Sequence, residues 1–183
     1  MTGGKSAFRK AAVLVMALTL AGCGDGGLFG GGNQRVENLE GFTAEQIFER
    51  GEYELSRARP EDAAYYFGEI ERLYPYSSWA QRALIMQAYS YHQDKDYENS
   101  RTAAQRFIDF YPADEDAAYA QYLLALSYYD QIDEVGRDQG LTFQALQALR
   151  AVIERYPDSE YATSAILKFD LAFDHLAGKE MEI

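Results

Sequence analysis

Side chains that could do chemistry are few in this chain, and their spacing does not suit catalysis. The sequence has 183 residues, two histidines and one cysteine. Ser90 and Asp94 flank His92, but residues two apart on a helix point to different faces, so a Ser-His-Asp triad is not expected. No glycine-rich phosphate loop joins a strand to a helix, and neither His92 nor His175 has the spacing of a zinc ligand. We therefore expect no cofactor, no metal site and no enzymatic activity.

Four acidic residues could instead gather a calcium ion. They are Asp130, Asp133, Glu134 and Asp138, in a polar run that contains glycine. The alternating aspartates and the closing glutamate of an EF-hand loop are missing from this run. An exposed acidic loop is therefore the favoured interpretation.

The single cysteine follows a secretory signal. Basic residues precede an apolar run over residues 11–20 that is too short to cross a bilayer, as in a signal peptide. The run ends in Leu-Ala-Gly-Cys, which resembles the lipobox of bacterial lipoproteins. This resemblance implies that residues 1–22 are removed by cleavage between Gly22 and Cys23, and that Cys23 carries a covalent lipid. A stable membrane anchor, rather than a buried thiol, is the resulting interpretation of Cys23.

Residues 23–42 form the predicted tether between this anchor and the folded body. Six of the nine residues from Gly24 to Gly32 are glycine, which disfavours a helix. Asp25 lies one residue beyond the place of the aspartate that resembles an inner-membrane retention signal. Outer-membrane delivery, with the body in the periplasm, is therefore favoured.

Composition limits the classes of partner. The formal net charge is −12, although the first 22 residues contain three basic residues and no acidic one. Such a surface repels phosphate backbones and anionic lipid head groups, so nucleic acid is not an expected partner. An apolar content of 48% is enough to bury a core over residues 43–183.

The body repeats itself around three Tyr-Pro pairs. Their prolines, Pro75, Pro112 and Pro157, are 37 and 45 residues apart. In each copy an apolar residue lies five places before the proline, and alanines lie five and eight places after it. These residues are Ile70, Phe107 and Val152, then Ala80, Ala117 and Ala162, and then Ala83, Ala120 and Ala165. Such self-similarity is typical of repeated helical pairs.

Local signals predict where these helices begin and end. Thr43 followed by Gln46 is a capping box for a helix that runs to about Ala58, and Pro60 starts a second helix. Proline disfavours helical geometry in the tyrosine before it, so each pair ends at Tyr-Pro. The next helices are predicted to start at the N-caps Ser77 (or Ser78), Asp114 and Ser159. The predicted repeats are therefore about 43–75, 77–112, 114–157 and a partial copy at 159–183.

The spacing of small residues resembles a tetratricopeptide repeat. The positions in the first copy are Gly51, Ala63, Phe67 and Pro75, and those in the second are Ala88, Ser100, Ala104 and Pro112. In the third copy, Ala125 and Ala145 are twenty apart rather than twelve, because of an insertion within 132–140. Small residues allow the close approach of paired helices. The expected fold is an all-α tetratricopeptide-like solenoid of about three full repeats and part of a fourth.

The repeat resemblance implies a groove lined by the first helix of each pair, suited to a peptide or partner segment. The groove positions carried over are Glu45, Phe48, Glu52, Arg82, Ile85, Tyr89, His92, Gln93, Tyr119, Tyr122, Leu126, Tyr129 and Asp130. The tyrosines suit core packing equally well. As a cluster, Tyr89, Tyr119, Tyr122 and Tyr129 would suit a partner with apolar or aromatic side chains, and Arg82 could hold a carboxylate.

The lipobox, the glycine-rich tether and the repeats ending in Leu-Tyr-Pro, Phe-Tyr-Pro and Arg-Tyr-Pro together resemble the BamD family, of the ComL type. Residues 67–80 and 148–161 are especially similar. The resemblance implies a lipoprotein subunit of the outer-membrane β-barrel assembly machinery. Such a subunit binds unfolded outer-membrane proteins and works with a BamA-type barrel subunit and other assembly subunits.

Two alternatives remain open at this point. One is a periplasmic repeat lipoprotein that serves as a scaffold for envelope or cell-wall proteins. The other is an enzyme docked through its repeats, with His92 as its best residue. Family members continue through further repeats, so the chain is expected to be truncated at its C-terminal end.

Overall fold

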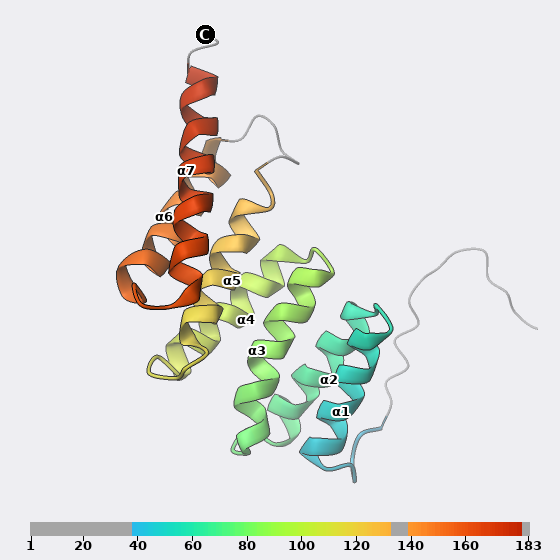
Figure 1. Ribbon diagram of the computed structural model, residues 1–183. Coiled ribbons are helices and arrows are strands. Elements are labelled where there is room, and N and C mark those ends of the chain that lie inside the picture. Colours follow the sequence, from blue (N-terminus) through green and yellow to red (C-terminus); the bar gives the residue numbers. More distant parts are fainter. Residues whose placement is uncertain (1–37, 133–138, 181–183) are drawn as a thin grey trace, which may run out of the picture. The chain divides into compact units, whose positions relative to one another are not determined.

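The computed structural model describes residues 38–132 and 139–180 (Figure 1). In these residues there are seven helices and no strand, which confirms the predicted all-α class. The predicted signal peptide, Cys23 and the tether up to residue 37 fall outside the described residues. The prediction is wrong for the end of the tether, residues 38–42, which belongs to the folded body. Leu39 is buried in the apolar core with residues of the first two helices, and the Tyr74 hydroxyl donates to the Phe42 carbonyl. No helix within the described residues is long and apolar enough to cross a membrane.

The helices follow one another as antiparallel pairs. They are α1 (Ala44–Ser56), α2 (Pro60–Leu73), α3 (Ser78–Gln93), α4 (Tyr97–Phe110), α5 (Ala117–Tyr129), α6 (Gln139–Arg155) and α7 (Glu160–Glu180). Each helix packs against the next, and α1, α3, α5 and α7 also pack against one another in that order (Figure 1). Among the described residues, α2, α4 and α6 make no such contacts with each other. The first helices of the pairs therefore form one continuous surface.

Helix starts follow the predicted signals at four places, three of them N-caps. At Thr43, the hydroxyl accepts from the Gln46 N–H at 3.2 Å, and the Gln46 side chain accepts from the Thr43 N–H at 2.9 Å. Pro60 is the first residue of α2. Ser77 and Ser159 cap α3 and α7, each accepting from an alanine N–H three residues later at 3.2 Å.

The prediction for Asp114 is wrong. The N-cap of α5 is Asp116, whose side chain makes no capping bond. The Asp114 carboxylate instead accepts from the Asp116 N–H at 2.9 Å and from the Gln81 amide on α3. An aspartate that bonds the backbone two residues on forms a turn of its own, so the helix starts after that turn.

Both complete turns within a pair use a left-handed residue that is not glycine. Ala58 has a φ of 55° and Lys95 a φ of 62°, and each lies seventeen residues before a repeat proline. The N–H of the residue after each of them donates to a carbonyl of the last helical turn. Arg59 donates to Glu54 at 3.0 Å, and Asp96 donates to Tyr91 at 2.9 Å. This closure resembles a Schellman cap, and it ends α1 at Ser56 rather than at about Ala58.

The small residues lie where paired helices meet. Gly51, Ala63, Ala88, Ser100, Ala125 and Ala145 are all buried. Ile70, Phe107 and Val152, the apolar residues five places before each proline, are 0% exposed. The Ser100 hydroxyl donates to the Ala88 carbonyl at 2.9 Å, which joins α4 to α3. The repeat register inferred from the sequence is therefore the register of the core.

The later copies depart from this regularity. Helix α6 begins at Gln139 and has 17 residues, against 14 for α2 and α4, so the end of the predicted insertion is helical. In the partial fourth copy, Ala162 and Ala165 are buried, like the alanines at the same offsets in the earlier copies. Phe173 is 55% exposed, because no described second helix covers α7. Tyr91 and Tyr128, which also lie sixteen residues after a repeat proline, are half-buried.

Replacing Gly51 with alanine tests the close approach of α1 and α2. A Cβ at this position would lie 2.7 Å from the ring of Phe67, which is 0% exposed. We expect Gly51→Ala to lower the free energy of unfolding by about 1–2 kcal/mol, because overpacking outweighs the helix propensity of alanine. Urea unfolding measures the change.

Gly68→Ala is the matched control. Its Cβ would meet only the end of the flexible, half-buried Gln87 side chain. Because that side chain can move, the control should be neutral or up to about 1 kcal/mol more stable. Equal stability of Gly51→Ala and the unmodified protein would contradict the assigned packing.

Candidate protein-binding face

The predicted groove residues divide into two groups in the structure. Phe48 and Ile85 are buried, with 2% and 6% of their surface exposed, so they are core residues and do not line a surface. Phe48 contacts Trp79 of α3, and Ile85 belongs to the apolar core cluster formed by α3 to α7. The remaining predicted residues, which we call the first-helix face, are at least partly exposed. They are Glu45, Glu52, Arg82, Tyr89, His92, Gln93, Tyr119, Tyr122, Leu126, Tyr129 and Asp130.

An aromatic contact joins α1 to α3. The rings of Phe48 and Trp79 lie 5.0 Å apart, and Phe48 also contacts Phe67 of α2 at 5.1 Å. The guanidinium of Arg82 lies over the rings of Phe48 and Trp79, 5.0 Å and 4.9 Å from their centroids. Cation–π attraction stabilises the arginine against these rings.

A second aromatic contact joins α5 to α7. The ring of Tyr161 lies 5.3 Å from Tyr119 and 5.5 Å from Tyr122. Tyr161 and Trp79 both stand four residues after a repeat proline, and each lies against a ring of the preceding first helix. This shared offset was the signal that could have predicted Tyr161 from the sequence.

The four tyrosines of the predicted cluster pack against one apolar core cluster, and Tyr161 of α7 joins them. Tyr119 interacts electrostatically with both Tyr89 and Tyr161, so these three rings and Tyr122 are neighbours. Tyr129 is a neighbour of Tyr122 and also lies beneath the Lys168 ammonium, 4.6 Å from its ring centroid.

Burial changes the acidity of this cluster. It raises the pKa of Tyr119 far above the usual 10.0, and the neighbouring Tyr89, Tyr161 and Asp116 raise it further. Burial also raises the pKa of Tyr122. Tyr119 and Tyr122 therefore keep neutral hydroxyl groups, and the cluster presents apolar ring faces.

His92 faces an acidic residue on the next first helix. Its Nε2 lies 3.1 Å from Oδ2 of Asp130 but has no hydrogen-bond partner among the described residues. Ser90 is buried and donates its hydroxyl to the Met86 carbonyl at 2.7 Å, while Asp94 caps α3. The structure thus brings together two predicted groove residues and separates the residues considered for a triad.

Of the acidic residues considered for calcium, only Asp130 is among the described residues. Asp133, Glu134 and Asp138 fall outside them. In residues 38–132 and 139–180, no group of three or more His, Cys, Asp or Glu side chains is placed to hold a metal ion.

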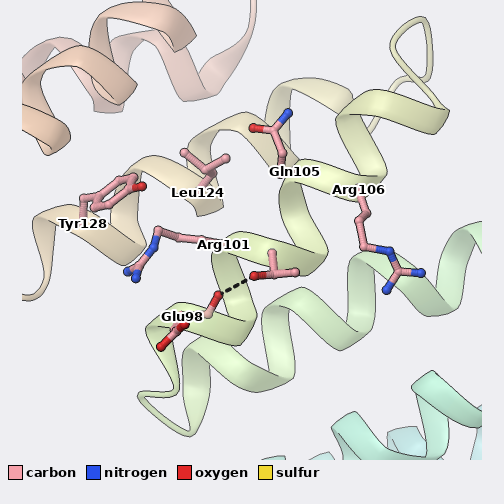
Figure 2. A pocket seen from close by; sticks show the side chains of 7 residues that line it. Glu98, Arg101, Gln105, Arg106, Leu124 and Tyr128 are labelled. Atoms are coloured by element: carbon pink, nitrogen blue, oxygen red, sulfur yellow. Dashed lines mark hydrogen bonds between the residues drawn. The ribbon is translucent and has the colours of Figure 1, made fainter.

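A pocket that the sequence did not reveal opens between α4 and α5, with a volume of about 400 Å³ (Figure 2). Its lining residues are Glu98, Arg101, Thr102, Gln105, Arg106, Leu124 and Tyr128. Figure 2 shows Arg101 beside Tyr128, where the guanidinium lies 4.6 Å from the ring centroid and also donates to the Ser127 carbonyl. Arg106 pairs with Glu71 of α2. Both cations of this pocket are therefore engaged within the protein.

Comparison with known proteins decides the family. Residues 41–183 match the YfiO family, described as "Outer membrane lipoprotein". The chain belongs to this family. The resemblance expected from the lipobox and the Tyr-Pro repeats is thereby confirmed.

Curated relatives carry the name "Outer membrane protein assembly factor BamD". The protein of Caulobacter vibrioides is 43% identical over 180 residues, which cover 98% of this chain and 57% of the relative. That of Rickettsia prowazekii is 37% identical over 94% of this chain and 65% of the relative. That of Neisseria meningitidis serogroup B is 25% identical over 92% and 66%. The chain spans less than two thirds of the length of the first two relatives.

The raised pKa of Tyr119 predicts a loss of stability in alkali. Above about pH 10 the unfolded tyrosine ionises while the folded one keeps its proton, so the unfolded state binds fewer protons. The stabilisation is therefore fully present below pH 10 and is lost as the pH rises further. Tyr119→Phe should flatten this fall in the free energy of unfolding.

Urea unfolding at several pH values between about 8 and 11 measures the effect. Tyr76→Phe is the control, because Tyr76 is 100% exposed and should leave the slope unchanged. If Tyr119→Phe and Tyr76→Phe give the same slope as the unmodified protein, Tyr119 does not lie in the environment described.

Proposed function

We propose that this chain acts in outer-membrane protein assembly as a non-enzymatic, lipid-anchored subunit. In this proposal its first-helix face binds unfolded outer-membrane proteins. The observation that carries it is the row of aromatic and polar side chains along successive first helices, in a chain whose relatives are named assembly factors.

The chemistry of the face suits such a ligand. Strands of outer-membrane barrels alternate apolar and polar residues and are rich in aromatic residues near the membrane interfaces. The tyrosines of the cluster offer ring faces to apolar side chains and neutral hydroxyl groups to an unpaired backbone. Gln93 and Glu52, which are exposed, add further polar groups. An extended segment could then lie across α1, α3 and α5.

The same proposal includes a BamA-type barrel subunit and other assembly subunits as partners. It places the protein on the periplasmic face of the outer membrane, anchored through lipid on Cys23, without nucleic acid as a partner. Support comes from the relatives' names, the lipobox and the acidic surface.

Site-specific photo-cross-linking tests the binding face. A photoreactive amino acid is placed at Glu52, Gln93 or Leu126, and the lipoprotein in detergent is mixed with an outer-membrane barrel protein diluted from urea. We expect cross-links at these three positions, because an extended ligand would lie within reach of all of them.

Exposed positions on the second helices provide the matched control. They are Glu61, Thr102 and Glu154. Equal cross-linking on both sides of the helix pairs would mean that the unfolded protein is not bound by the first-helix face.

Replacing Cys23 with alanine tests the anchor separately. Without the thiol, no lipid can be attached at this position, so the predicted membrane anchor is lost. The variant should fail to incorporate labelled palmitate, and it should leave the membrane fraction or accumulate as an uncleaved precursor. Palmitate labelling that persists in Cys23→Ala would contradict the predicted lipidation.

A further inference from the structure

One edge of the helix array carries the turns between repeats and the start of α1. Because antiparallel helices alternate in direction, the beginnings of α1, α3, α5 and α7 lie at the same edge as the ends of α2, α4 and α6 (Figure 1). Hydrogen bonds join its successive segments: the Tyr74 hydroxyl donates to the Phe42 carbonyl, and the Gln81 amide donates to Asp114. The predicted tether joins the folded body here, at Asn38, so we call this the anchor-side edge. It consists of residues 38–43, 74–77, 110–116 and 156–159.

Exposed aromatic side chains distinguish this edge from the opposite one. Tyr76 is 100% exposed, Phe110 62% and Phe42 46%, and none of the three belongs to an apolar core cluster. The complete turns of the opposite edge, residues 57–59 and 94–96, consist of charged residues and one alanine. Exposed apolar groups that gather on one side of a protein are typical of an interaction site.

The charge of the anchor-side edge limits what it can contact. Its segments contain no basic residue, and their acidic residues are Glu40, Asp114, Glu115, Asp116 and Asp158. An anionic surface would be repelled, whereas zwitterionic lipid head groups would not. Aromatic rings suit such a lipid surface, because tyrosine pairs an apolar ring with a polar tip and phenylalanine enters the apolar side of the interface.

We propose that the anchor-side edge lies against the membrane, with Phe42, Tyr76 and Phe110 in the head-group region of zwitterionic phospholipids. This inference goes beyond the proposed function and rests on one part of it, the lipid on Cys23. A glycine-rich chain as long as residues 23–37 spans roughly 20 Å. A short link of this kind gives a tethered group an effective concentration of about millimolar. A contact too weak to bind an unanchored protein is therefore enough to orient the anchored one.

The contact would fix the orientation of the binding face. The first-helix face adjoins the anchor-side edge, since α1, α3 and α5 begin there. With that edge on the membrane, these helices point away from the lipid surface, and the face between them stays open to a ligand from the side.

Site-specific fluorescence tests this orientation on the mature lipoprotein in vesicles of phosphatidylcholine and phosphatidylethanolamine. Ser78→Cys and Asp94→Cys each place a thiol at an exposed position, one beside Tyr76 and one on the opposite edge. An environment-sensitive fluorophore attaches at this thiol, because Cys23, the only native cysteine, carries the lipid. The label at residue 78 should be blue-shifted and should be quenched by phospholipids brominated on their acyl chains. The label at residue 94 should show neither effect.

Substitution of the aromatic residues then tests their part in the contact. In the protein labelled at residue 78, Tyr76→Ser combined with Phe42→Ser should remove most of the quenching. Tyr53→Ser is the matched control, because Tyr53 is as exposed as Phe42, at 46%, but lies towards the other end of α1. It should leave the quenching unchanged. Circular dichroism checks that each variant retains its helices.

Equal quenching at residues 78 and 94, or quenching that survives the double substitution, would overturn the inference. Adding phosphatidylglycerol at low salt should weaken the quenching, so a stronger signal with this anionic lipid would also contradict it. Palmitate labelling separates the two possible failures. Labelled protein without a difference between the edges loses only the membrane contact, whereas protein that takes up no palmitate loses the anchor as well.

Discussion

The structure depends on how closely the two helices of each pair approach. At these contacts the side chains are small, from Gly51 against Phe67 to Ser100, whose hydroxyl reaches the Ala88 carbonyl. Larger groups would separate helices whose axes lie about 8–10 Å apart. Because each pair is closely packed, the next pair can stack on it with its first helix against the preceding first helix.

The surface follows from this stacking. First helices in contact bring residues of different repeats together, so that His92 of α3 meets Asp130 of α5 and Tyr161 of α7 meets Tyr122 of α5. Each contact requires only one suitable residue in each copy, at a fixed distance from the repeat proline. Variation between copies therefore changes the chemistry along the face without disturbing the core. Arg82 and Tyr119 illustrate this, since both stand seven residues after a proline but one is a cation and the other a neutral ring.

Sequence reasoning succeeded where the cause was local or periodic. The cap at Thr43 needs only residues 43–46, and the buried Ile70, Phe107 and Val152 follow from the repeat itself. It failed at Asp114, because a turn competed with the cap for the same carboxylate. The left-handed Ala58 and Lys95 were also missed, since neither is glycine or asparagine and pair closure decides their conformation.

The binding face was harder to predict, because burial between first helices depends on the next repeat. The repeat pattern assigns both Phe48 and Arg82 to the groove. It does not reveal that Phe48 is buried beneath Arg82, which is itself exposed. Similarly, four tyrosines spaced along two helices indicated one cluster, but their spacing did not reveal that Tyr161 of α7 joins it or that Lys168 lies over Tyr129. Such contacts join residues more than thirty positions apart, and one sequence alone does not record them.

We propose above all that this array of helix pairs works in outer-membrane protein assembly. Its most direct test is affinity purification of the full-length gene product, tagged at its C-terminus, from detergent-solubilised outer membranes, followed by mass spectrometry. The account predicts recovery of a BamA-type barrel subunit. Recovery of peptidoglycan or division proteins without that subunit would contradict it and would favour a scaffold for envelope enzymes.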